Sequence, residues 1–120
     1  MKGEEMKKDI IYRCFKYAVR IVKFYEGIEK SGAGRIIGKQ LLRSGTSIGA
    51  NVNEAQSGQS KADFISKMYI AYKEARETVY WLKLIKESGI HNDTTELTKE
   101  AEELVKILAS IIKSAKNTKC

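Results

Sequence analysis

The sequence predicts an all-α fold, an antiparallel up-down bundle of four helices that forms one domain over residues 1–120. Apolar residues recur at alternating spacings of three and four, which is the period of helices that pack on one another. No stretch alternates as a strand does, and the chain has no proline. Short breaks rich in Gly, Ser and Asn lie at 31–34, 57–60 and 88–92, and connections this short make sequential helices antiparallel neighbours.

The first helix, expected over about residues 6–30, has more apolar surface than one core can cover. Its seam, at heptad-like spacing, is Ile11, Cys14, Ala18, Ile21, Tyr25 and Ile28. Further apolar residues widen this seam on both sides: Ile10, Tyr12, Phe15, Tyr17, Val19, Val22 and Phe24. The whole arc spans roughly 240°, against about 100° to 140° for a helix with one buried face. We therefore expect this helix to face two partners.

The second helix, expected over about 35–56, contains many residues that an isolated helix disfavours. Its inward line is Ile37, Leu41, Gly45, Ile48, Val52 and Ala55. Ser44, Ser47 and Asn51 flank that line on one side, where a partner helix would approach. Each glycine costs up to about 1 kcal/mol relative to alanine inside a helix, so close packing has to offset the loss. Gly32, in the preceding break, is predicted to end the first helix.

The third and fourth helices are expected over about 61–87 and 94–116. Ser60 with Asp63, and Asp93 with Glu96, have the spacing of a capping box, and Gly89 is predicted to end the third helix. The inward positions of the third helix are Phe64, Met68, Ala71, Ala75, Val79 and Leu82. Those of the fourth helix are Leu97, Ala101, Leu104, Leu108, Ile111 and Ala115.

Composition excludes several classes of protein. A hydrophobic fraction of 42% in 120 residues is enough for a core and excludes disorder. No apolar run is long enough to span a membrane, and the first residues do not resemble a signal peptide, so the chain is expected to be cytoplasmic and not to bind membranes. Two cysteines, Cys14 and Cys120, do not make a disulfide framework. With His91 the only histidine, we expect no metal and no cofactor.

The net charge of +7 points to an anionic partner, RNA or DNA, although solubility alone is the alternative. Four cations lie on one line opposite the seam of the first helix: Arg13, Lys16, Arg20 and Lys23. This stripe is about 15 Å long and could follow a nucleic-acid backbone, or it could be an ordinary solvated face. A second candidate surface near the end of the fourth helix is Lys113, Lys116 and Lys119.

Glu74 and Glu77 share one flank of the third helix, a spacing that acid/base or metal chemistry could use. A structural ion pair is the favoured interpretation, because Arg43 on the second helix, or the nearby Arg76, could hold both carboxylates. Ser44 and other hydroxyl residues of the second helix have no base beside them in any readable triad. We expect that the protein is not an enzyme.

The surplus apolar surface predicts self-association. The residues expected at the oligomer interface are Phe24 and Tyr17 on the first helix and Ile70 and Trp81 on the third. The alternative is a monomer with apolar flanks.

Three segments together resemble a known family: residues 40–55, Asp63-Phe64, and residues 73–82. They closely resemble the bacterial 23S ribosomal RNA intervening-sequence proteins, which are related to the accessory protein of diversity-generating retroelements. The resemblance implies antiparallel four-helix bundles assembled into a pentameric ring, basic and without an enzyme site, associated with RNA and a reverse transcriptase partner. It also implies a structural polar network formed by Arg43, Asn51, Glu54, Glu74 and Glu77.

We therefore expect a non-catalytic, ring-forming homo-oligomer that binds RNA or DNA through basic surface stripes. The alternative is a protein-interaction scaffold, in which the apolar flanks recruit a partner protein and the charge serves solubility.

Overall fold

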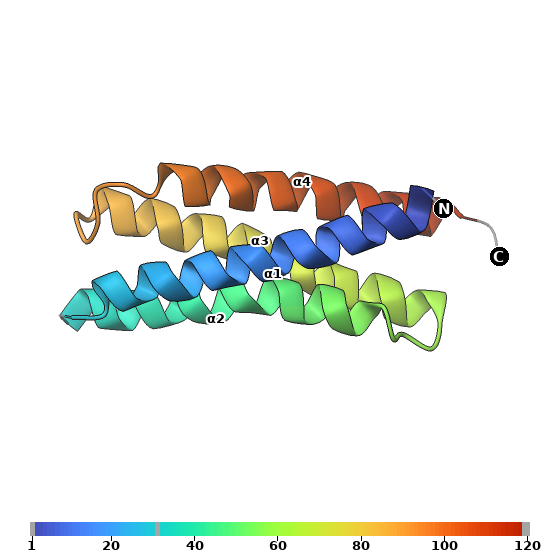
Figure 1. Cartoon of the computed structure of the whole chain (residues 1–120), viewed down its shortest axis with the longest axis horizontal. Helices are drawn as coiled ribbons and strands as arrows, with labels where there is room; N and C mark the ends of the chain where they lie inside the picture. Colours follow the sequence, from blue (N-terminus) through green and yellow to red (C-terminus); the bar gives the residue numbers. More distant parts are fainter. Residues whose placement is uncertain (1, 31, 119–120) are drawn as a thin grey trace.

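The chain folds into four α-helices that lie side by side along one long axis (Figure 1). This computed structural model describes the backbone of residues 2–30 and 32–118, and the side chains of residues 9–30 and 32–118. The helices are α1 (Lys2–Ile28), α2 (Gly32–Ala55), α3 (Lys61–Glu87) and α4 (Thr95–Asn117). Residues 2–30 and 32–118 contain no β-strand. The bundle measures 51 × 22 × 19 Å. The prediction of an all-α fold with four helices is confirmed.

Each helix packs mainly on its neighbours in sequence. The closest pairs are α1 with α2, α2 with α3, and α3 with α4, whereas α1 approaches α4 much less closely. In Figure 1 the connections lie at alternating ends of the bundle, and α1 runs obliquely from the end of α4 toward the start of α2. One side of α1 therefore packs against α2, and another side makes a less extensive contact with α4.

Three helix starts differ from the sequence predictions. Helix α1 already begins at Lys2, and α2 begins at Gly32, which opens that helix instead of ending the one before it. Asp93 is not the N-cap of α4, because Thr94 holds that position and Asp93 Oδ1 accepts a bond from Thr95 N at 3.4 Å. The N-cap at Ser60 is confirmed, since its hydroxyl accepts a bond from Asp63 N at 3.1 Å.

The end of α3 is a complete glycine cap. Gly89 has φ +81°, a left-handed conformation that glycine adopts without strain. Its N–H donates to the carbonyl of Lys86, and Ile90 N–H donates to that of Ile85, both at 3.1 Å. This pair of bonds is the Schellman arrangement, and it fixes the turn into α4.

The core runs the length of the bundle and draws on all four helices. Cys14 lies in it, and burial raises the pKa of its thiol to about 12. The thiol therefore stays protonated and unreactive near neutral pH. Cys120 lies outside the described residues.

Glycines on α2 let α1 approach closely. A Cβ built on Gly45 would lie 2.9 Å from two side-chain carbons of Ile21, and one on Gly34 would lie 2.4 Å from the carbonyl oxygen of Ile28. A Cβ on Gly49 would touch Cys14 at 3.3 Å. The close packing predicted to offset the helix cost of these glycines is therefore present, mostly on the side of α2 that faces α1.

Candidate functional site

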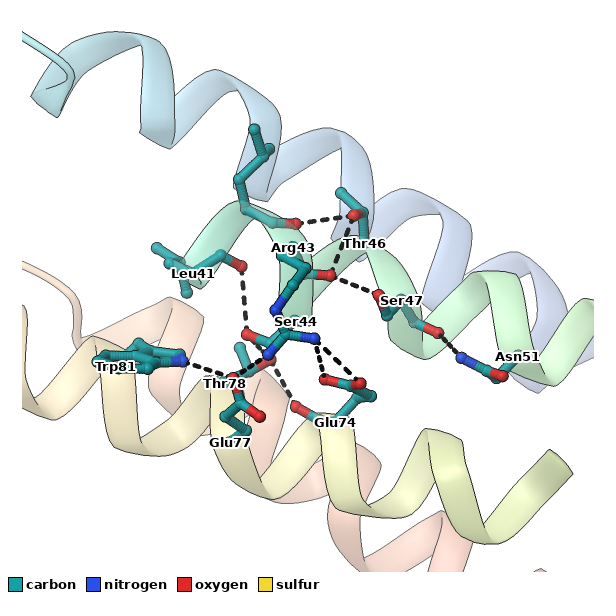
Figure 2. Close-up of polar contacts among 11 residues, drawn as sticks. Leu41, Arg43, Ser44, Thr46, Ser47, Asn51, Glu74, Glu77, Thr78 and Trp81 are labelled. Carbon is teal, nitrogen blue, oxygen red and sulfur yellow. Dashed lines mark hydrogen bonds and ion pairs between the residues drawn. The ribbon is translucent and has the colours of Figure 1, made fainter. Parts of the chain in front are cut away.

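Arg43 links the middle of α2 to α3 (Figure 2). Its Nη1 donates to both carboxylate oxygens of Glu74, at 3.1 and 3.2 Å, and its Nη2 donates to Glu77. Trp81 Nε1 donates to the same Glu77 oxygen at 2.9 Å. The hydrogen bond to Glu77 is the largest cause of a raised pKa of Arg43. The Arg43 side chain is nevertheless 48% exposed, so this is a surface clamp and not a buried ion pair.

Beneath the clamp, two hydroxyl groups join the same helices inside the core. Ser44 and Thr78 are both fully buried, and their hydroxyl oxygens lie 3.0 Å apart. Thr78 Oγ1 also lies 2.8 Å from the carbonyl oxygen of Glu74, and Ser44 Oγ lies 3.3 Å from that of Leu41. Each hydroxyl thus has polar partners, which removes the penalty of burying it. The flank of small polar residues on α2 serves this contact with α3.

Asn51 and Glu54 do not join the Arg43 clamp, which corrects the expected network of five residues. Asn51 Nδ2 donates to the carbonyl oxygen of Ser47 on its own helix at 2.8 Å. Glu54 pairs with Lys67 on α3 at 3.0 Å, and both side chains are largely exposed. Glu54 therefore makes a separate contact between α2 and α3, whereas the bond of Asn51 stays within α2.

Arg13 leaves the predicted cation stripe of α1, because a carboxylate of α4 holds it. Its Nε and Nη2 donate to Glu100 at 2.7 and 2.9 Å, a bidentate pair that raises the pKa of Arg13. Arg20 lies over the ring of Tyr17 at 5.9 Å, on the same side of the helix. Lys16 and Lys23 are exposed. Lys16, Arg20 and Lys23 form no ion pair with a carboxylate among the described residues, and they lie beside acidic residues of α4.

Positive charge is concentrated in the first half of the bundle. In α1, α2 and the turn between them, residues 9–55 contain eight Lys or Arg and four Asp or Glu, whereas residues 56–118 contain ten Lys or Arg and nine Asp or Glu. Besides the cations of α1, the exposed cations of this half are Lys30, Arg35 and Lys39, together with Arg43, which holds Glu74 and Glu77. The α1–α2 side is therefore the basic side of the molecule.

The expected oligomer interface has to be revised at Tyr17. That residue is 1% exposed in the single chain, and its hydroxyl donates to the carbonyl oxygen of Leu97 at 2.8 Å. Phe24 is partly buried, with its ring 4.9 Å from that of His91. Ile70 and Trp81 are intermediate in exposure. This flank of α1 is covered by α4 and the loop before it, and so belongs to the fold.

The surplus apolar surface lies on the other flank of α1. Four residues at helical spacing form what we call the α1 apolar stripe: Tyr12, Phe15, Val19 and Val22. All four are exposed, Tyr12 at 62% and Phe15 at 65%. The width of the apolar arc in the sequence predicted that this helix has a second apolar surface. It did not indicate which flank of the helix carries that surface.

The part of the chain with described side chains contains no group of three or more His, Cys, Asp or Glu that could hold a metal ion. No helix in the described part is long and apolar enough to cross a membrane.

Comparison with known proteins gives one family. The family model described as 23S rRNA-intervening sequence protein matches residues 6–110. A crystal structure of a protein of unknown function from the S23 ribosomal protein family of Bacteroides thetaiotaomicron superposes with a TM-score of 0.84 and 41% identity, covering 90% of this chain and 98% of that one. Comparison with curated proteins found no match. The chain belongs to the 23S rRNA-intervening sequence protein family.

Proposed function

We propose that this protein is a non-catalytic homo-oligomer that binds RNA or DNA through the basic α1–α2 side. The observation that carries the proposal is the charge distribution, eight cations against four carboxylates over residues 9–55, compared with ten against nine over residues 56–118. Six of the eight cations form no ion pair with a carboxylate among the described residues, so they are available to phosphates: Lys16, Arg20, Lys23, Lys30, Arg35 and Lys39. Phosphate contacts of this kind give affinity with little sequence preference.

Self-association is the second part of the proposal. The α1 apolar stripe leaves four apolar side chains along one face of the helix in water, and a second copy of the chain would cover them. The family resemblance suggests a pentameric ring built from up-down bundles. In such a ring the basic side would be repeated around the assembly, and several subunits could engage one nucleic acid.

Substitution of the exposed cations tests the nucleic-acid proposal. Replacing Lys16, Lys23, Arg35 and Lys39 together by Gln should weaken binding to a labelled RNA and flatten its salt dependence. A matched control removes four cations that lie outside this side: Lys61, Lys67, Lys86 and Lys99. Equal weakening by both sets would mean that net charge alone, without a defined surface, attracts the RNA.

A protein-interaction scaffold is the second candidate, and the α1 apolar stripe also favours it, because an exposed apolar stripe can recruit another protein. The two proposals predict different results. A scaffold whose charge serves solubility would not bind RNA even at low salt, and its α1 apolar stripe would stay accessible in the purified protein.

A further inference from the structure

A long groove follows the outer side of the α3–α4 pair. One hollow of about 390 Å³ lies between Tyr69 and Tyr72 of α3 and Lys113 and Lys116 of α4. A second, of about 550 Å³, is lined by Arg76, Tyr80 and Lys83 of α3 and by Val105, Lys106 and Glu102 of α4. The two follow one another along the same pair of helices. From residue 69 to residue 83 the groove is about 21 Å long at 1.5 Å per residue.

Aromatic rings and cations alternate along the α3 wall of this groove. Tyr69 and Tyr80 are exposed at 45% and 60%, and the ring of Tyr72 lies 5.8 Å from that of Tyr69. Lys73 Nζ lies over the ring of Tyr69, 5.5 Å from its centre, and the guanidinium of Arg76 lies over that of Tyr72 at 5.8 Å. Arg76 and Lys83 line the same hollow as Tyr80, so this wall presents aromatic rings interspersed with positive charge.

Helix α4 separates its charges between its two sides. Glu100 faces α1, where it holds Arg13, whereas Lys106, Lys113 and Lys116 line the groove. In the middle of α3, Glu74 and Glu77 likewise point to α2 and hold Arg43. Glu102 is the acidic residue that lines the second hollow, where it lies 3.9 Å from Lys83. Although residues 56–118 carry only one more Lys or Arg than Asp and Glu, the groove along α3 and α4 is cationic.

We propose that the α3–α4 groove binds single-stranded nucleic acid, with bases stacked on Tyr69 and Tyr80 and phosphates held by Arg76 and Lys113. Stacking on aromatic rings in a basic groove is how proteins hold single strands without reading their sequence. A duplex keeps its bases stacked inside, so it cannot use the rings. The inference rests on the proposed function, since it names the class of nucleic acid and adds a second surface for it.

Stacking is tested at Tyr80 with a labelled 12-nucleotide oligouridylate and a duplex RNA of equal length. Tyr80→Phe keeps the ring and should bind the single strand as the native protein does. Tyr80→Leu keeps the apolar character but loses the ring, and should weaken single-strand binding by about tenfold, as expected for one lost stack. Equal single-strand binding by the two variants, or a loss of duplex binding in Tyr80→Leu as large as its loss of single-strand binding, would overturn the inference.

Charge is tested with paired variants and the same oligouridylate. Arg76→Gln with Lys113→Gln should flatten the slope of log affinity against log salt by about 1.4, which corresponds to two phosphate contacts on a single strand. If only Lys23→Gln with Lys39→Gln on the α1–α2 side flattened the slope, the groove would be excluded and the proposed function would stand. If the native protein bound neither RNA at low salt, both would fail. Displacement by polyglutamate as effective as by unlabelled oligouridylate would identify an acidic peptide site instead.

Discussion

Arg43 shows how exposure changes the energetic meaning of a contact. An arginine that holds two carboxylates would be worth several kcal/mol if fully buried, because its removal would leave a carboxylate stranded. Here the guanidinium is about half exposed, and Glu77 is 36% exposed. Water therefore screens the charges of Arg43 and of its two carboxylate partners. The clamp contributes more to the alignment of α2 on α3 than to the stability of either helix.

We expect Arg43→Ala to lower the free energy of unfolding by about 1 kcal/mol, a value typical of exposed ion pairs with good geometry. Urea unfolding measures it. A double-mutant cycle with Glu77→Gln should give a coupling of about 0.5 to 1 kcal/mol. A loss above about 3 kcal/mol would mean that the clamp is buried in solution, for example by a second subunit.

Two buried acidic groups make stability depend on alkaline pH. Burial raises the pKa of the Cys14 thiol to about 12 and also raises the pKa of the Tyr17 hydroxyl. In the unfolded chain these groups titrate near 8.5 and 10, so above pH ~9 the unfolded state loses protons that the folded state retains. Their stabilising contribution is present below pH ~8.5 and is lost as the pH rises toward 12.

The unfolding free energy should therefore fall between pH 8.5 and 10.5, by up to about 1.4 kcal/mol per pH unit for each group that titrates in the unfolded state alone. Cys14→Ala in a Cys120→Ser background should reduce that fall, even though it lowers stability at pH 7. An unchanged slope between the two proteins would show that the thiol titrates freely in the folded state.

Among the helices, the α1–α2 contact depends most on residue size. A methyl group added at Gly45 would meet the stiff, β-branched side chain of Ile21 at 2.9 Å, with no room to turn away. Gly27, near the end of α1, has nothing within 4 Å of such a methyl group and provides a matched control.

Gly45→Ala should destabilise the bundle by about 1 to 3 kcal/mol through overpacking, although alanine favours a helix. Gly27→Ala should be neutral or should stabilise by up to about 0.5–1 kcal/mol. Thermal unfolding by circular dichroism compares them. If Gly45→Ala were as stable as Gly27→Ala, the helices would not approach as closely as described.

Helix periodicity explains which features could be predicted from sequence. The spacing of apolar residues is a local property, so it located the four helices and the inward line of α2 that includes Gly45. A helical wheel has no information about the side on which the next helix lies. For that reason Tyr17, which α4 covers, and Phe15, which it leaves exposed, could not be told apart. Contacts between distant residues, such as Arg13 with Glu100, leave no local pattern at all.

At the scale of the whole molecule, the α1 apolar stripe predicts an oligomer. Phe15→Glu should dissociate the oligomer, because burying a charge in an interface is unfavourable. The variant should keep its helicity, because Phe15 is 65% exposed in the single chain. Ile36→Glu, at an equally exposed apolar residue of α2, is the control and should keep the assembly. Light scattering measures both masses. A native mass of 13.5 kDa over a wide concentration range would exclude self-association.

The most direct test of the account is the affinity of the native protein for a labelled single-stranded RNA, measured by fluorescence anisotropy from low to physiological salt. If three or more cations of each subunit meet phosphates, log affinity should fall with log salt at a slope of about −2 or steeper. Several subunits engaging one RNA would steepen it further. The absence of binding at low salt, or an affinity that does not change with salt, would contradict the account.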